Sequence, residues 1–238
     1  MKKAQIAVVT GATKGIGKAV VELLADKGFD VWFCARNSSA VMLMQAQLAE
    51  KYPKQRFWGM ACDLGTILGR DALAASLQEK LSHIDILLNN TGVFMPGGIL
   101  TEAPGVLEQQ VETNLYSAYH VTRAAFPLLQ QSQLAHIFNM CSTASITAYV
   151  NGGSYAITKF GLLGMTKVLR EELKPFGIKV TAILPGATKT ASWEGTELPD
   201  ARFMQADDVA KALWACYDLG PSAVVEELLM RPLPGDIG

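Results

Sequence analysis

The chain has 238 residues, of which 50% are hydrophobic and only 18% are charged. This length fits one α/β domain with a sizeable core, and the composition excludes a disordered chain or a coiled coil. Because 21 basic residues balance 22 acidic ones, the net charge is -1, which excludes the strongly basic surface of a nucleic-acid-binding protein.

Apolar strand-like runs alternate with helical patterns along the whole chain. Most of these runs are continuously apolar, as in parallel strands that helices cover on both faces. The alternation predicts one domain over residues 1–238, with a doubly wound α/β fold: a three-layer α/β/α sandwich around a seven-stranded parallel sheet. The predicted order is strand 4–9, helix 15–27, strand 30–35, helix 41–51, strand 56–61, helix 71–81, strand 84–89, helix 104–131, strand 134–141, helix 153–174, strand 178–184, helix 207–219 and strand 223–230.

Three features of the sequence bear on the cellular compartment. The apolar run near the N-terminus is interrupted at Thr10, so no secretory signal core is predicted. Residues 124–158 carry no charge, but their glycines, glutamines and asparagines exclude a membrane span and predict a segment buried on both sides. Four scattered cysteines without C-x-x-C spacing are typical of a reduced, cytoplasmic protein.

The first strand is followed by a glycine-rich loop, Thr-Gly-Ala-Thr-Lys-Gly-Ile-Gly at residues 10–17, which opens a helix. In parallel sheets of this kind, ligands bind beyond the carboxyl ends of the strands. Glycines there let the backbone approach a pyrophosphate and present the helix N-terminus to it. A plain strand-to-helix turn is the alternative, but the position after the first strand favours a nucleotide site. The loop lacks the Gly-Lys-Ser/Thr ending of a Walker loop, which argues against a kinase or ATPase.

The end of the second strand distinguishes the two nicotinamide cofactors. Sites for NAD carry an acidic residue about 20 residues after the glycines, on the ribose hydroxyls. Here the strand ends in Cys-Ala-Arg36-Asn37, without an acid. Arg36 suits a 2′-phosphate, and Lys14 can add a second positive charge. Each alone could be a solvated surface cation, but together, with the acid missing, they predict NADP(H).

The candidate catalytic residues lie in the uncharged segment 124–158 and in the helix predicted over 153–174. Tyr155 and Lys159 have i, i+4 spacing, which puts both side chains on one helix face, and Ser142 ends the preceding strand. A free tyrosine titrates near pH ~10, too high for a general acid/base. We expect a neighbouring ammonium and a cationic nicotinamide to lower this pKa by about two to three units.

Taken together, these motifs resemble the short-chain dehydrogenase/reductase family over essentially the whole chain. The resemblance implies a Rossmann-type fold and an oxidoreductase that transfers a hydride between NADP(H) and a carbonyl or secondary alcohol. Reduction is the expected direction. The pieces that carry the resemblance are the loop 10–17, Asp63-Leu64, Asn89-Asn-Thr-Gly92, Asn114, Ser142, Tyr155-Ala-Ile-Thr-Lys159, and Pro185-Gly186 with Thr190.

The resemblance also implies a role for each matching residue. Tyr155 is expected to exchange a proton with the substrate oxygen, which Ser142 holds. Lys159 is expected to lower the tyrosine pKa and bind the nicotinamide ribose, and Asn114 to support a water-mediated proton relay behind it. The expected cofactor contacts are Gly11, Thr13, Lys14, Gly15, Ile16, Gly17, Arg36, Asp63, Leu64, Asn90, Gly92, Tyr155, Lys159, Pro185, Gly186, Thr188 and Thr190.

The chain departs from the family pattern in places. Thr91 replaces the usual alanine of Asn-Asn-Ala-Gly, and the C-terminus lacks the common Gly-Gly and Asp-Gly ending, so no oligomer contact is inferred there. A homodimer or homotetramer is nevertheless implied by the resemblance. A short substrate lid is expected at about 190–205, where Trp193, Leu198 and Phe203 either line a small or flat substrate site or merely pack the lid.

Some alternatives remain open at this point. The chain could be an NAD-linked sugar or hydroxy-acid dehydrogenase, or a non-catalytic nucleotide-sensing protein on the same fold. The family resemblance does not choose among acyl thioesters, sugars, pterins, steroids and quinones as substrates. No metal site is predicted, because His83, His120 and His136 are solitary. Cys141 has no visible base and is expected to be a buried hydrophobic residue, and no nucleic acid or membrane partner is expected.

Overall fold

The computed structural model of the protein describes residues 4–190, 193 and 195–236. At its centre lies a seven-stranded sheet with the order β3-β2-β1-β4-β5-β6-β7, in which all neighbouring strands are parallel. The strand order reverses between β1 and β4, which confirms the predicted doubly wound fold. The strands are β1 (Ile6–Thr10), β2 (Asp30–Ala35), β3 (Phe57–Ala61), β4 (Ile86–Asn89), β5 (His136–Met140), β6 (Lys179–Pro185) and β7 (Glu227–Met230).

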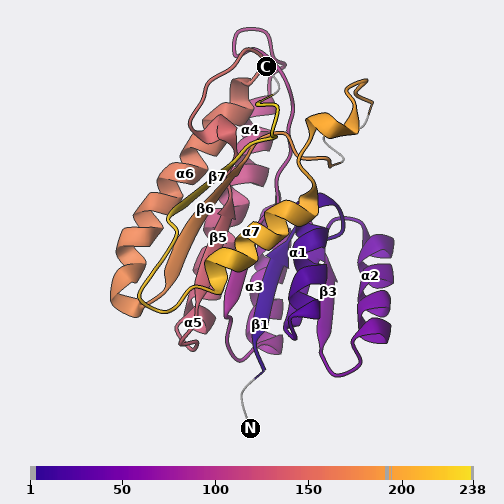
Figure 1. Cartoon of the computed structure of the whole chain (residues 1–238), viewed down its shortest axis with the longest axis vertical. Coiled ribbons are helices and arrows are strands. Elements are labelled where there is room, and N and C mark those ends of the chain that lie inside the picture. Colours follow the sequence, from indigo (N-terminus) through magenta and orange to yellow (C-terminus); the bar gives the residue numbers. More distant parts are fainter. Residues whose placement is uncertain (1–3, 191–192, 194, 237–238) are drawn as a thin grey trace.

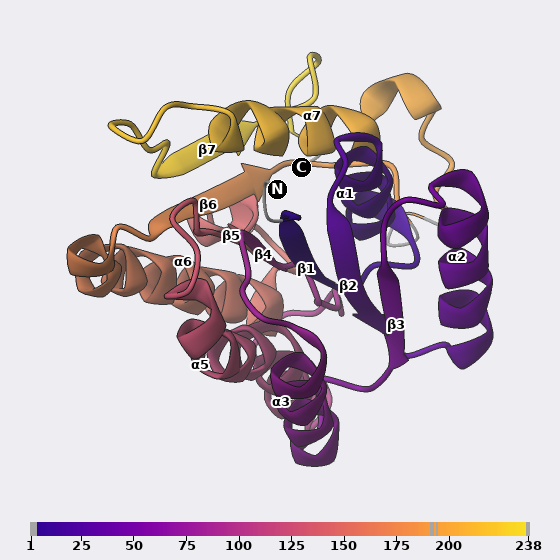
Figure 2. The ribbon, with the colours of Figure 1, turned by 90° about the horizontal axis from the view of Figure 1, so that it is seen from below.

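Helices cover both faces of this sheet, as Figures 1 and 2 show. One face carries α1 (Gly15–Asp26), α2 (Ser38–Lys51) and α7 (Ala206–Tyr217), and the other carries α3 (Ile67–Lys80), α5 (Ser117–Leu129) and α6 (Gly153–Leu173). Helix α4 (Val106–Val111) packs against α6. Short helical turns complete the chain: the π-helix η1 (Glu112–Tyr116) and the 3-10 helices η2 (Thr143–Ser145), η3 (Lys174–Phe176) and η5 (Asp200–Arg202). Among the described residues, no helix has both the length and the apolar character that a membrane crossing would need.

The two faces of the sheet are buried in separate clusters of apolar side chains. In β1, Ala7 and Val9 pack with α1, α2 and α7, while Ile6 and Val8 pack with α3 and α5. Val8 is opposite Trp32 of β2 and also opposite a residue of β4. Because successive side chains of a strand point to opposite faces, both faces need apolar residues. This explains the continuous apolar runs in the sequence.

Several boundaries differ from the sequence prediction for local reasons. Helices α2 and α3 begin at Ser38 and Ile67 instead of 41 and 71, because Asn37 and Thr66 cap them. Each cap side chain accepts a hydrogen bond from the backbone N–H three residues on, over 2.9 Å and 3.0 Å. The last strand is also shorter than predicted, since β7 begins at Glu227.

The helix predicted over 104–131 is interrupted. The structure has α4, then the π-helical turn η1, and then α5, which ends at Leu129. A π-turn inserts one residue into a helical path and shifts the direction of the side chains in it. Asn114 lies in this turn and is completely buried. The irregular turn therefore directs one of the predicted catalytic residues inward.

Candidate active site

A cleft with a volume of about 810 Å³ opens where the strands β1 to β6 end. This is the edge at which the strand order reverses, where ligands bind in doubly wound folds. The lining contains every predicted catalytic and cofactor residue except Gly17 and Asn114. The predicted residues in the lining are Gly11, Thr13, Lys14, Gly15, Ile16, Arg36, Asp63, Leu64, Asn90, Gly92, Ser142, Tyr155, Lys159, Pro185, Gly186, Thr188 and Thr190.

The glycine-rich loop forms the floor of one end of the cleft. Gly11 and Gly15 have φ angles of +65° and +53°, which favour glycine. Asn90 braces the loop from the end of β4, since its Nδ2 donates to the carbonyls of Thr10 and Gly11 over 3.0 Å each. Lys14 is the N-cap of α1 and makes no side-chain capping bond. The first N–H groups of α1 thus keep the character of a site for a phosphate group.

Gly17 lies behind this loop, outside the cleft lining. A Cβ atom at Gly17 would be 2.3 Å from the carbonyl oxygen of Gly11 and 2.6 Å from Nδ2 of Asn90. The glycine therefore lets α1 pack closely against the loop. The structure shows this packing contact, and the cofactor contact expected from the family resemblance stays a prediction.

We expect Gly17→Ala to lower the free energy of unfolding by about 1–3 kcal/mol, because the added methyl group must displace backbone of the loop. The matched control is Gly164→Ala, in the exposed middle of α6, where a Cβ meets nothing within 4 Å. That control should be neutral or stabilising by up to about 1 kcal/mol. Chemical denaturation of the three proteins measures the difference. Equal destabilisation by both variants would contradict the packing argument.

Two cations face this end of the cleft. Lys14 comes from the glycine loop and Arg36 from the end of β2, and both lie in the lining. Among the described residues, neither forms an ion pair. The residue after Arg36 is Asn37, whose side chain caps α2. This end of the cleft therefore offers positive charge, and no acidic side chain follows β2.

Ser142, Tyr155 and Lys159 meet at the other end of the cleft. Tyr155 lies in the first turn of α6, and its ring packs edge-on against Phe94 with 4.9 Å between ring centres. The ammonium of Lys159 is 5.6 Å from the centre of the tyrosine ring and donates to the carbonyl of Met140 over 2.7 Å. Ser142 begins the turn η2 after β5, where its hydroxyl accepts from the backbone N–H of Ala144.

Burial is the largest influence on the pKa values of Tyr155 and Lys159. It raises the pKa of Tyr155, and the contact with the Ser142 hydroxyl only partly offsets that rise. Burial also lowers the pKa of Lys159 to about 8. In the chain alone, burial is thus the largest influence on the tyrosine pKa. The expectation that Lys159, together with a cationic nicotinamide, lowers this pKa stays a prediction.

Asn114 is positioned behind the cleft lining. Its Oδ1 accepts from the backbone N–H of Val93 over 2.7 Å, and its Nδ2 donates to the carbonyl of Val93 and to the hydroxyl of Thr158, over 2.9 Å and 3.0 Å. It thus joins the segment after β4 to the residue that precedes Lys159. The proton relay expected from the family resemblance stays a prediction.

We expect Asn114→Ala to lower the free energy of unfolding by about 2–4 kcal/mol, since it removes a completely buried side chain and leaves the N–H and carbonyl of the half-buried Val93 without their partner. The control Asn37→Ala removes an exposed helix cap and should cost about 1 kcal/mol. Thermal or urea unfolding, with both variants compared to the native chain, measures the two losses. A loss at Asn114 no larger than at Asn37 would show that these bonds contribute little.

Aromatic side chains border the cleft beside Tyr155. Phe94, Tyr149 and Trp193 lie in the lining, and the ring of Trp193 packs against Phe203 with 5.0 Å between centres. Phe203 itself is buried outside the lining, and Leu198 does not line the cleft. Of the three aromatic and apolar residues expected in the lid, one lines the cleft and one packs beneath it. Residues 191, 192 and 194 of the expected lid lie outside the described residues.

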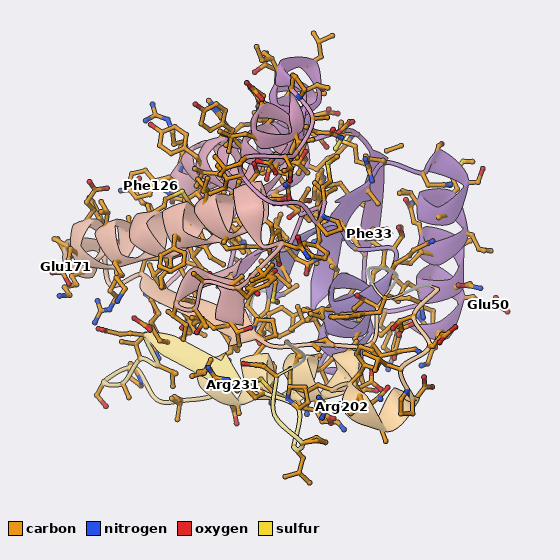
Figure 3. All side chains as sticks on the ribbon, turned by 90° about the horizontal axis from the view of Figure 1, so that it is seen from above. Phe33, Glu50, Phe126, Glu171, Arg202 and Arg231 are labelled. Atoms are coloured by element: carbon orange, nitrogen blue, oxygen red, sulfur yellow. The ribbon has the colours of Figure 1, made fainter. Side chains whose placement is uncertain are left out.

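The C-terminal segment supplies a lining residue that the sequence did not indicate. Asp236 lies in the cleft, and its carboxylate accepts from Nε of Arg231 over 2.7 Å. Arg202 holds the same segment through the carbonyls of Pro234 and Asp236. Figure 3 shows Arg202 and Arg231 on the same side of the molecule. The contacts of Arg202 have no local sequence signal, because Arg202 is more than 30 residues away from the segment that it holds.

Comparison with known proteins adds to this geometry. Residues 5–199 match the family described as short chain dehydrogenase. An uncharacterized oxidoreductase of Staphylococcus epidermidis is 27% identical over 231 residues, which cover 97% of this chain and 98% of that protein. A 3alpha-hydroxysteroid dehydrogenase of Mediterraneibacter gnavus is 30% identical over 190 residues, which cover 80% of this chain and 76% of that protein.

The fold is similar to solved structures as well. A metagenomic short-chain oxidoreductase, solved in complex with NADP, is 28% identical with a TM-score of 0.82, and the match covers 96% of each chain. The family match spans most of the sequence, and the cleft lies at the same reversal of strand order that this kind of fold uses for its ligands. The protein therefore belongs to the short-chain dehydrogenase family of oxidoreductases.

Proposed function

We propose that the protein is an NADP(H)-dependent oxidoreductase that interconverts a carbonyl compound and a secondary alcohol, with Tyr155 as its general acid/base. The observation that carries the proposal is one cleft whose lining includes Ser142, Tyr155 and Lys159 at one end and the glycine loop with Arg36 at the other. The solved relative with 28% identity is a complex with NADP, which supports the choice of cofactor.

The chain's own residues fit such a cofactor. The N-terminus of α1, without a side-chain cap, suits the pyrophosphate, and Lys14 with Arg36 suits a 2′-phosphate. Asp63 is suited to the adenine edge, and Lys159 to the nicotinamide ribose. When bound, NADP(H) supplies or takes up the hydride. The protein contributes binding, orientation and the movement of a proton.

The protonation of Tyr155 suits the reduction direction. Because burial raises its pKa, the phenol is protonated at neutral pH and can donate the proton on Oη to a carbonyl oxygen. In the proposal, the Ser142 hydroxyl holds that oxygen while the proton moves. Lys159, which carries charge below its pKa of about 8, stabilises the phenolate that remains. Its bond to the carbonyl of Met140 fixes the ammonium at this place.

The aromatic residues in the cleft lining favour, as the substrate in this proposal, an uncharged compound with a flat, apolar body. Phe94, Tyr149 and Trp193 offer aromatic surface there, and Asp236 is a charged residue in the lining outside the cofactor set. The carboxylate of Asp236 is paired with Arg231, so this part of the lining offers no free positive charge to a phosphate or carboxylate on the substrate. The 30% identical relative is named for a hydroxysteroid, a molecule of this shape and polarity, which agrees with the proposal.

The proposal also includes a homodimer or homotetramer in the cytoplasm. Exposed apolar side chains on η1, α5 and α6, among them Tyr116, Tyr119 and Phe160, support an interface between copies of the chain. The four cysteines are free thiols, which suits a reducing compartment.

The test is NADPH consumption, followed by absorbance, with a panel of ketones, aldehydes, quinones, sugars and hydroxy acids, and with NADH in parallel. We expect turnover of uncharged apolar ketones or quinones with NADPH. Tight NADPH binding without turnover of any compound would favour the non-catalytic nucleotide-sensing alternative. Preferred use of NADH or NAD with sugars or hydroxy acids would favour the NAD-linked alternative.

A further inference from the structure

Cys34 and Cys62 form a thiol pair in the cleft that the proposed reaction does not use. Cys34 belongs to β2, and Cys62 directly follows the neighbouring strand β3. Cys34 is the register partner of Met60, and the N–H of Cys62 donates to the carbonyl of Ala35 over 3.1 Å. Cys62 is two residues beyond Met60, so the two cysteine side chains lie on the same face of the sheet. Both line the cleft.

The two thiols interact with each other and have different surroundings. Cys34 is only 1% exposed, whereas Cys62 is half-buried and reachable from the cleft. The interaction with Cys34 lowers the pKa of Cys62, and the same interaction together with burial raises the pKa of Cys34. Cys62 is therefore the better nucleophile of the two, with a second thiol next to it.

The other cysteines lack these features. Burial raises the pKa of Cys141 to about 11 and also raises the pKa of Cys216. Both are buried, and the groups that shift their pKa values include no second cysteine. Among the described residues, the structure thus sets one pair of thiols apart from two isolated ones.

We infer that Cys34 and Cys62 are a peroxide-sensitive dithiol, which a hydroperoxide converts into a disulfide inside the cofactor cleft. The Cys62 thiolate attacks one oxygen of the hydroperoxide, so that an S–O bond forms and the O–O bond breaks. The other oxygen leaves with a proton as an alcohol or water, and Cys62 becomes a sulfenic acid. The sulfur of Cys34 then attacks Cys62, an S–S bond forms, and the hydroxyl leaves as water with the proton of Cys34. The two thiols together lose two electrons, which reduce the hydroperoxide.

Oxidation of this pair acts on the cofactor loop. The sulfur of Cys34 also interacts with the backbone N–H of Gly11, and the carbonyl of Cys34 accepts from the N–H of Ala12 over 3.0 Å. The loop packs closely at this point, since a Cβ at Gly11 would be 3.1 Å from Nδ2 of Asn90. A disulfide draws the sulfur of Cys34 toward Cys62 and away from this loop. We expect it to weaken NADP(H) binding, a consequence that rests on the proposed function.

The disulfide is tested first, by a measurement that needs no cofactor. The native chain is treated with hydrogen peroxide, its free thiols are blocked with N-ethylmaleimide, and it is digested with trypsin. We expect a linked pair of peptides, residues 28–36 with residues 57–70, that separates on reduction with dithiothreitol. The control Cys216→Ser should form the same linked pair. In Cys34→Ser, Cys62 should instead stop at the sulfenic acid, which dimedone labels.

Cofactor binding is tested second, on the same samples. NADPH affinity, measured by fluorescence, should fall by about tenfold or more on oxidation and return with dithiothreitol in the native chain and in Cys216→Ser. In Cys34→Ser the fall on oxidation should be smaller than in the native chain, because Cys62 has no second thiol with which to form the disulfide. Absence of the linked peptides while other thiols oxidise overturns the dithiol. A linked pair with unchanged NADPH affinity overturns its effect on the cofactor. If the reduced chain does not bind NADPH at all, the proposed function fails, and the peptide result still decides the dithiol.

Discussion

Replacing Tyr155 by phenylalanine should lower kcat by about 10²–10⁴-fold and leave the affinity for NADPH nearly unchanged. The ring stays in the first turn of α6 and keeps its edge contact with Phe94. What the variant loses is the hydroxyl, which in the proposed function is the donor of the proton to the carbonyl oxygen. Steady-state kinetics with the best substrate of the panel gives kcat, and NADPH fluorescence gives the affinity.

A second hydroxyl provides the control. Tyr217 lies outside the cleft lining, and its hydroxyl accepts a hydrogen bond from Gln5 over 2.9 Å. Tyr217→Phe should therefore reduce stability slightly and leave kcat within about twofold of the native value. If Tyr155→Phe turned over at the native rate, Tyr155 would not be the acid/base. If both variants lost activity together, the loss would come from the fold and not from proton transfer.

The local motifs in the sequence predicted most of the cleft. The fold follows from the alternation of apolar runs, and it is confirmed by the parallel sheet. The glycine loop, Arg36 and the group of Ser142, Tyr155 and Lys159 could be located because each directly follows a strand or begins a helix. A parallel sheet brings the carboxyl ends of its strands to one edge, so residues far apart in sequence meet there.

Other features had no local signal. The π-helical turn that buries Asn114 depends on contacts with Val93 and Thr158, which are distant in sequence. Asp236 lines the cleft, and its carbonyl accepts a hydrogen bond from Arg202, which is distant in sequence. The direction of the pKa shift of Tyr155 depends on how much water the folded chain excludes, which the spacing of Tyr and Lys does not contain.

The thiol pair is a further case of this kind. In the sequence, Cys34 and Cys62 are widely separated and have no C-x-x-C spacing, so the sequence predicts only reduced thiols there, as for the other two cysteines. Parallel pairing of β2 with β3 brings them to the same face. Sequence spacing predicts disulfides or redox pairs only when the two cysteines are close along the chain or the strand register is already known.

Replacing Arg36 by aspartate should weaken NADPH binding by about 10- to 100-fold or more, while NADH binding stays the same or improves. In the proposed function, the guanidinium of Arg36 donates to the 2′-phosphate, which only NADPH carries. The aspartate removes these charge-assisted bonds and adds repulsion, whereas on NADH it can accept from the ribose hydroxyls. Arg36 is exposed and forms no ion pair within the described part of the chain, so its loss leaves no partner unpaired. Titration of each cofactor by fluorescence measures both affinities.

The control for this variant must change the net charge equally. Lys54→Asp does so in the exposed turn after α2, outside the cleft lining, and should change either affinity by less than about twofold because salt screens distant charges. Equal losses of NADPH and NADH in Arg36→Asp would mean that Arg36 supports the shape of the cleft and does not select the phosphate. A selective loss of NADPH in Lys54→Asp as well would assign the preference to the overall field of the protein. Only a selective loss confined to Arg36→Asp places the 2′-phosphate at the end of β2.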